Sequence, residues 1–209
     1  MRYKSIFNNE TGENTYLLFD EETKNGVIID PGCKIEDINK LISDNGVSVK
    51  YILLTHCHYD HIMSVIPLAA KTGAKIVTGD VGSKNISNPN INLTKHGLGY
   101  AIDDIKTDKI LYDGDVLELD SIKIKCIYTP GHTSCGVCYY TNGELFCGDT
   151  LFLRSCGRWD LPTGNMDILF RSIKERLYTL PDDTIVHPGH GHDTSIGYEK
   201  KYNFCVRDD

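Results

Sequence analysis

Three imidazoles and a carboxylate lie within six residues, in the segment His56-Cys57-His58-Tyr59-Asp60-His61. The whole chain contains 8 histidines, so chance does not readily account for three in one short window. Imidazole and carboxylate together form a donor set that zinc, iron and manganese accept. A loop of this length can turn several side chains toward one point. The segment therefore predicts a metal centre.

Three further segments each present one potential ligand beside a glycine. Glycine lets the backbone approach closely and adopt angles that other residues avoid, which is useful around a crowded centre. Taken alone, His132 is equally consistent with a hydrogen-bonded core histidine, and Asp149 with a turn residue or helix cap. Four segments of one type in one chain support one another. The three are Thr129-Pro130-Gly131-His132-Thr133, Cys147-Gly148-Asp149-Thr150 and His187-Pro188-Gly189-His190-Gly191.

The elements that must position these side chains alternate between strand and helix patterns, which predicts an α/β fold. The mostly apolar run 47–55 predicts a buried strand that leads directly into the histidine cluster, and a helix is expected within 62–73. Loops at the carboxyl ends of strands hold ligands in open α/β sheets, because the strand fixes the root of the loop. We also expect strands at 14–19, 26–30, 74–78 and 184–187, a β-rich block over 113–148 with a hairpin turn at Asn142-Gly143, helices at 35–46 and 166–180, and a loop or insertion at 84–108.

Composition limits the class of protein. The chain carries 22 Lys and Arg against 29 Asp and Glu, a net charge of −7, and no basic stripe that would bind nucleic acid. No apolar run approaches the roughly 18 residues of a membrane span, and the polar start lacks the apolar core of a secretory signal. We expect one cytoplasmic domain over 1–209, with no nucleic-acid or membrane partner and with reduced cysteines. The sequence indicates no oligomeric state.

The order and spacing of the potential ligands resemble the metallo-β-lactamase superfamily. The resemblance runs from the Asn14-Thr15-Tyr16 strand and the IIDPG turn to the PGHG turn. It implies a four-layer αβ/βα sandwich with two divalent metal ions at one edge, zinc or alternatively iron or manganese. By that pattern Asp149 bridges the metals, and Asp60 also orients the nucleophile. The implied ligands are His56, His58 and His132 for the first metal, and Asp60, His61 and His190 for the second.

Two segments resemble the glyoxalase II-like branch, in its short bacterial form without a C-terminal helical domain. They are Gly148–Phe152 and Cys156–Asn165. This resemblance implies a small-molecule thioester substrate, such as S-lactoylglutathione or a related acyl-thiol, cleaved by a hydroxide that bridges the metals. Arg158 is the candidate contact for an anionic group of the substrate, since guanidinium binds carboxylate with two hydrogen bonds. A salt bridge between Arg158 and Asp160 is the alternative.

A rival hypothesis is a mono-iron glutathione persulfide dioxygenase. The string Arg154–Asp160 also resembles those enzymes, and the iron ligands would be His56, His132 and Asp149, a subset of the seven. A third hypothesis, a non-catalytic metal-holding scaffold, gives a complete set of seven ligands no use. Outside the predicted centre, the C-x-x-C of Cys135 and Cys138 predicts core thiols. His96 is expected at the surface, while His187 and His192 are either donors that orient a ligand or exposed side chains.

Overall fold

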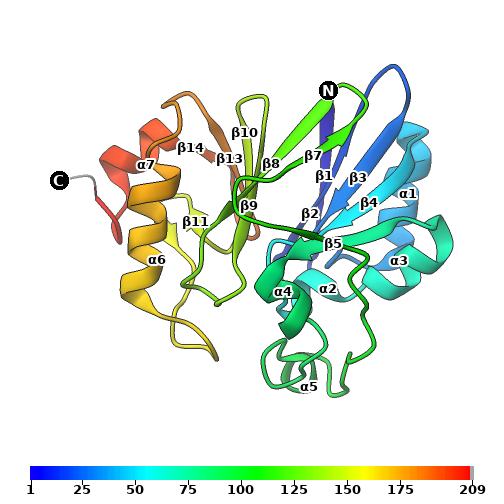
Figure 1. Ribbon diagram of the computed structural model, residues 1–209, viewed down its shortest axis with the longest axis horizontal. Coiled ribbons are helices and arrows are strands. Elements are labelled where there is room, and N and C mark those ends of the chain that lie inside the picture. Colours follow the sequence, from blue (N-terminus) through cyan, green and yellow to red (C-terminus); the bar gives the residue numbers. More distant parts are fainter. Residues whose placement is uncertain (208–209) are drawn as a thin grey trace.

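The computed structural model describes residues 1–207, which form two six-stranded sheets packed face to face with helices on both outer faces (Figure 1). The first sheet has its strands in sequence order, antiparallel from β1 to β3 and parallel from β3 to β6. Its strands are β1 (Arg2–Phe7), β2 (Asn14–Phe19), β3 (Asn25–Ile29), β4 (Ser48–Leu53), β5 (Lys75–Gly79) and β6 (Lys109–Leu111).

The second sheet has the order β14-β13-β10-β9-β8-β7, and only its β10–β13 pair is parallel. The β9–β10 hairpin turns at Asn142 and Gly143, both with positive φ, as the Asn-Gly pair predicts. The strands are β7 (Val116–Leu119), β8 (Ile122–Tyr128), β9 (Val137–Thr141), β10 (Glu144–Gly148), β13 (Ile185–Pro188) and β14 (Thr194–Ser195). A separate small hairpin joins β11 (Leu151–Phe152) and β12 (Ser155–Cys156).

The helices complete the four layers. Figure 1 shows α1 and α3 outside the first sheet, α6 and α7 outside the second, and α2, α4 and α5 gathered at one end of the sandwich. The expected αβ/βα sandwich is therefore confirmed. The helices are α1 (Ile35–Asn45), α2 (Tyr59–Ile62), α3 (Val65–Thr72), α4 (Asp80–Asn85), α5 (Thr94–Gly97), α6 (Met166–Ser172), a π-helical turn at Ile173–Leu177, and α7 (Ile196–Tyr202).

Alternating side chains of the central strands fill two different layers. Along β2, Leu17 and Phe19 pack toward the helices on the outer face, while Tyr16 and Leu18 pack between the sheets. Both faces of the strand are thus buried, which explains why it lacks the polar alternation of a half-exposed strand. This packing makes the sheets a rigid base for the loops at their ends.

Several parts of the chain differ from the expectation. β1 and α7 did not stand out in the sequence, and the expected insertion 84–108 contains the last residues of α4 and all of α5. The long helix expected at 166–180 continues from α6 into a π-helical turn. All eight cysteines are free thiols, and those of the C-x-x-C are buried, as expected. Among residues 1–207, no helix is long and apolar enough to cross a membrane.

Candidate metal centre

The histidine cluster leaves the carboxyl end of β4 and enters the short helix α2. The next strand in that sheet, β3, runs parallel to β4 and ends just before Asp30. In the second sheet the parallel strands β10 and β13 end just before Asp149 and His190. Because parallel strands end at the same edge, these topologies bring residues far apart in sequence to one place.

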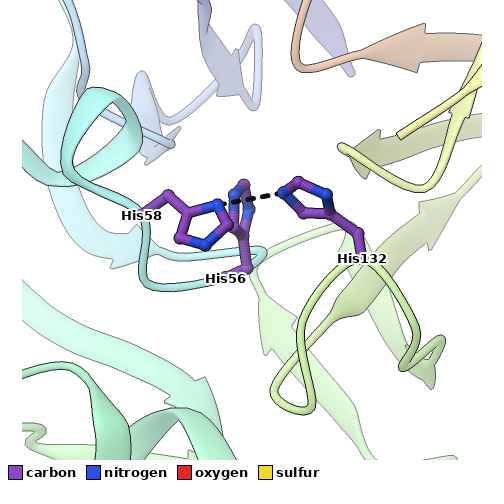
Figure 2. Close-up of side chains that lie close together, drawn as sticks. All are labelled: His56, His58 and His132. Carbon is purple, nitrogen blue, oxygen red and sulfur yellow. Dashed lines mark hydrogen bonds between the residues drawn. The ribbon is translucent and has the colours of Figure 1, made fainter. Parts of the chain in front are cut away.

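The first group consists of His56, His58 and His132, all buried, whose ligand atoms lie within 4.8 Å of one another. Figure 2 shows His56 and His58 on the loop after β4, facing His132 on the loop after β8. His132 Nε2 lies 3.0 Å from His58 Nδ1. Around a tetrahedral zinc ion, nitrogens at about 2.0–2.1 Å from the metal are about 3.3 Å apart. The geometry is therefore suited to one small cation.

The second group consists of Asp60, His61 and His190, again with ligand atoms within 4.8 Å. His190 Nε2 lies 3.2 Å from Asp60 Oδ2, and His61 Nε2 lies 4.0 Å from the same oxygen. This set mixes one carboxylate with two imidazoles. Such a set can hold zinc, iron or manganese.

Asp149 lies between the two groups. Its Oδ2 is 3.5 Å from His132 Nε2 and 3.6 Å from His190 Nε2, and its Oδ1 is 3.4 Å from His61 Nε2. One carboxylate thus faces ligand nitrogens of both groups. This is the position that a bridging ligand requires.

Hydrogen bonds on the far side of each ring set which nitrogen faces the centre. His132 Nδ1 donates to the carbonyl oxygen of Arg158 at 2.6 Å, and His61 Nδ1 donates to Asp30 Oδ2 at 2.9 Å. His56 Nδ1 lies 3.1 Å from the hydroxyl oxygen of Thr55, which itself donates to Asp30. In these three rings Nε2 therefore faces the centre with its lone pair, as a metal ligand requires, and that of His132 lies against His58 Nδ1.

Several inward-facing atoms have no other partner. Within residues 1–207, His56 Nε2, His61 Nε2 and Asp149 Oδ1 are buried without a hydrogen bond. A buried polar atom without a partner costs roughly 1–3 kcal/mol, so a cluster of them needs an explanation. Metal ions held by these atoms would provide the missing partners, and the residues present fit that role.

The pKa shifts of the buried histidines also indicate a site for cations. Burial lowers the pKa of His58 to about 3 and that of His56 well below its ordinary value, so both rings are neutral. Burial alone would lower the pKa of His61 too, but Asp149, Asp60 and Asp30 raise it well above the ordinary value. The carboxylates thus favour positive charge at the centre of the site, which divalent cations supply.

Asp30 and Thr55 support the histidines through hydrogen bonds, a role that the sequence did not single out. Asp30 Oδ1 accepts a hydrogen bond from the backbone N–H of Thr55 at 2.8 Å, and its other oxygen accepts from the Thr55 hydroxyl at 2.6 Å. Asp-Pro-Gly is typical of a turn, which masks the role of this carboxylate. The available signal was its position at the end of an expected strand, 26–30.

The loop that carries His190 is held by strand β2 of the other sheet. Asn14 Nδ2 donates to the carbonyl oxygens of Pro188 at 3.1 Å and Gly191 at 3.0 Å. Tyr16 Oη also donates to Pro188, at 2.7 Å. The position of His190 in the second group is therefore fixed by two residues of β2.

Glycines permit the close approach of these loops. A Cβ at Gly189 would lie 2.3 Å from Asp149 Oδ1 and 2.7 Å from His61 Cε1. Gly148 has φ of +49°, and its Cβ would lie 2.1 Å from the hydroxyl oxygen of Thr55. Larger residues would displace the groups that the centre brings together.

A pocket of about 470 Å³ opens beside the centre and is lined by residues from both groups. Arg158, the candidate substrate contact, also lines this pocket. Its guanidinium forms two hydrogen bonds with Asp160, at 2.7 and 2.8 Å, and is largely exposed. The salt bridge that the sequence left as the alternative is therefore present, while the contact of Arg158 with substrate stays a prediction.

The other histidines lie apart from the two groups. His96 and His192 are exposed. His187 is fully buried, and its Nε2 lies 2.6 Å from Glu144 Oε2, with the ring stacked on Phe146. Of the two roles left open for His187, exposure is thus wrong.

Comparisons with known proteins place this geometry in context. Hydroxyacylglutathione hydrolase GloC of Haemophilus influenzae is 33% identical over 199 residues, which cover 91% of each chain. The crystal structure of TTHA1623 in a di-iron-bound form has a TM-score of 0.84 and 32% identity, covering 97% of this chain and 100% of that one. The structure of ETHE1 from Myxococcus xanthus has a TM-score of 0.82 and 29% identity, covering 98% and 84%.

The family model described as the metallo-beta-lactamase superfamily matches residues 8–190, which include all seven potential ligands. The two-sheet sandwich and the order of the histidines and aspartates agree with that match. The chain belongs to the metallo-β-lactamase superfamily.

Proposed function

We propose that the protein is a metal-dependent hydrolase that holds two divalent metal ions and cleaves a thioester, S-lactoylglutathione or a related acyl-thiol. The observation that carries this proposal is the position of Asp149, within 3.4–3.6 Å of ligand nitrogens from both groups. A carboxylate so placed can act as a ligand of two metals at once. The similarity to the GloC hydrolase supports the substrate class, and the di-iron-bound relative supports two metals.

The proposed ligand assignment follows the two groups: His56, His58 and His132 would hold the first metal, and Asp60, His61 and His190 the second. Asp149, which faces nitrogens of both groups, would be shared between them. Bound divalent ions lower the pKa of coordinated water and polarise the carbonyl of a substrate. Zinc, iron and manganese all suit this donor set.

Asp60 is the proposed residue for orienting the attacking water. Burial alone would raise the pKa of Asp60, but His61 and His190 lower it, so its carboxylate is ionised near neutral pH. Asp60 also lines the pocket. A carboxylate there can accept a hydrogen bond from water and hold the proton that leaves it.

A thiol leaving group fits this arrangement of side chains. A free thiol has a pKa of about 8.5, so a thiolate can leave near neutral pH without protonation by a general acid. An amine leaving group would require a proton donor. Arg158 lines the same pocket and is the proposed contact for an anionic part of the substrate. Its guanidinium would release Asp160 and bind a carboxylate of the substrate instead.

The second candidate function is the mono-iron persulfide dioxygenase. It is favoured by one feature of the geometry, since His56, His132 and Asp149 alone form a two-histidine, one-carboxylate set of the kind used by non-haem iron oxygenases. The closeness of His132 Nε2 to Asp149 Oδ2, 3.5 Å, allows both to bind one ion. In this reading His58, Asp60, His61 and His190 would have no role as ligands.

The decisive experiment compares the wild-type protein with His58→Ala, which removes a ligand of the first group but leaves the mono-iron set intact. We expect close to two metal ions per wild-type chain by elemental analysis, and loss of S-lactoylglutathione cleavage in the variant. His96→Ala, which changes an exposed histidine outside the centre, should match the wild type. Wild-type turnover by His58→Ala would refute the two-metal proposal. One iron per chain together with oxygen uptake on glutathione persulfide would establish the second candidate.

A further inference from the structure

Leu93 belongs to the insertion 84–108, yet it lines the pocket beside the metal centre. Its backbone has φ of +61° and ψ of 14°, a left-handed conformation that is unfavourable for a branched side chain. Strain of this kind persists only where surrounding structure imposes it, and it is concentrated at functional sites. Neighbouring residues must therefore hold the backbone of Leu93 in this conformation.

The residue before Leu93 anchors the insertion. Asn92 is fully buried, and its Nδ2 donates to the carbonyl oxygens of Ile86 at 2.7 Å and Ile102 at 2.9 Å. Its Oδ1 accepts from the backbone N–H of Thr94 at 3.0 Å and from the Thr94 hydroxyl at 2.8 Å. Every hydrogen-bonding group of this amide is used. The backbone on both sides of Leu93 is thus fixed.

A second contact joins the insertion to the metal-binding loop. Helix α5 packs on α2, where a Cβ on Gly97 would lie within 2.4–2.5 Å of three ring atoms of Tyr59. The ring of Tyr59 therefore fits directly against the backbone of Gly97. Since Tyr59 lies between His58 and Asp60, the insertion and the centre are held in one arrangement.

Apolar side chains besides Leu93 also line the pocket. Tyr59, Phe152 and Leu161 line the same pocket. The guanidinium of Arg158, which also lines it, is already paired with Asp160. A pocket of this kind binds an aliphatic group through burial of its surface and measures its length by steric contact. Leu93 is the one apolar lining residue that the insertion contributes to this pocket.

We propose that Leu93 is a specificity-determining residue that limits the length of the aliphatic group accepted beside the metal centre, so that the preferred substrates are thioesters carrying a short aliphatic group. This inference rests on the proposed thioester hydrolysis for its reaction. The pocket limits the length of the aliphatic group, and Asn92 and Gly97 hold the side chain of Leu93 in place.

The test replaces Leu93 by Gly and by Phe and measures kcat/KM on acetyl, butyryl and hexanoyl thioesters of one thiol. Glycine removes the side chain and also suits the left-handed backbone, so Leu93→Gly should fold normally. We expect the ratio of hexanoyl to acetyl kcat/KM to rise at least about tenfold in Leu93→Gly, the lower end of what one methylene group is worth in an apolar pocket, and to fall in Leu93→Phe. Tyr100→Ala, which truncates an exposed residue of the same insertion, should keep the wild-type ratio. An unchanged ratio in both Leu93 variants would overturn the inference.

Binding provides a readout that does not depend on hydrolysis. Isothermal titration measures the affinity for S-methyl, S-butyl and S-hexyl thioethers of the same thiol. The ratio of S-hexyl to S-methyl affinity should be higher in Leu93→Gly than in the wild type. If the wild-type protein cleaves no thioester but the affinities shift in this way in Leu93→Gly, the proposed function fails and the role of Leu93 stands. Thioesters cleaved with no shift in either measurement would leave the function standing and remove the role of Leu93.

Discussion

Asp30 Oδ2 lies 2.9 Å from His61 Nδ1, and both side chains are almost completely buried. The same oxygen accepts a hydrogen bond from Thr55, whose hydroxyl lies 3.1 Å from His56 Nδ1. One carboxylate therefore orients a histidine of each group, directly in one case and through a hydroxyl in the other. The two groups therefore share a supporting carboxylate, Asp30, and both face the carboxylate of Asp149.

Replacing Asp30 by Asn should weaken metal binding. The amide keeps the size of the carboxylate but loses the charge and presents an N–H₂ group to at least one of its present donors. Loss of such a supporting carboxylate costs about 10–100-fold in metal affinity. The measurement is competition with a chelator of known affinity, and Asp37→Asn, at an exposed site on α1, is the control. Equal affinities for wild type and Asp30→Asn would contradict the role.

Gly189→Ala should disrupt the centre without changing any ligand. The added Cβ would lie 2.3 Å from Asp149 Oδ1, so the carboxylate or the backbone must move. Displacement by about 1 Å can cost about 100-fold in rate, and we expect a loss of that size in kcat/KM. Gly99→Asn is the matched control, because that position is open and asparagine tolerates its positive φ. Activity within about twofold of wild type in Gly189→Ala would show that the loop adapts.

Glu199 should contribute to stability rather than to catalysis. This fully buried carboxylate accepts hydrogen bonds from the backbone N–H of Arg154 at 2.9 Å, from Thr194 Oγ1 at 2.6 Å and from Asn203 Nδ2 at 2.7 Å. Truncation in Glu199→Ala leaves these donors without an acceptor, which should lower the free energy of unfolding by about 3 kcal/mol. Urea denaturation measures the change, and Glu175→Ala at an exposed site is the control. A loss below about 1 kcal/mol would show that water replaces the carboxylate.

The Asp113–Arg176 pair predicts a small, pH-dependent contribution. Burial alone would raise the pKa of Asp113, but hydrogen bonds from Arg176 and from the Tyr128 backbone lower it below its ordinary value. A lowered folded-state pKa stabilises the protein above the unfolded pKa of about 3.9, and that stabilisation is lost as pH falls through the folded value. Both side chains are 39–40% exposed, so the coupling should be below about 1 kcal/mol.

A double-mutant cycle with Asp113→Asn and Arg176→Gln, followed by urea denaturation, measures this coupling. It should be constant between pH 5 and pH 7 and should shrink below about pH 4. Coupling that grows on acidification would have the wrong sign for a paired carboxylate.

The potential ligands were predictable because their types are rare and their spacing is local. His56, His58 and His61 lie in one short segment at the end of an apolar strand, and that pattern is visible without any tertiary information. Asp30 was not, because the segment Asp-Pro-Gly is also typical of an ordinary turn. Its role depends on the parallel pairing of β3 with β4, a long-range relationship that sequence patterns do not specify.

The helix and strand that the sequence did not predict have a similar explanation. Helix α5 has four residues, too few for a helical period, and it depends on the buried side chain of Asn92. Strand β1 lies at the edge of its sheet and is mostly exposed or half-buried, so its composition lacks the apolar pattern of the central strands. Leu93 offered no signal, since its importance comes from the conformation that its neighbours impose.

The hydrogen bonds from Asn14 and Tyr16 to the loop around Pro188 join residues separated by 174 and 172 positions in the chain. During synthesis on the ribosome, the first strands emerge long before that loop exists. The nascent chain can gather His56 and His58 early, but it lacks His190 until 129 residues beyond His61 have been translated. If the proposed second metal binds through Asp60, His61 and His190, its binding must therefore wait until β13 has been made and has met β2.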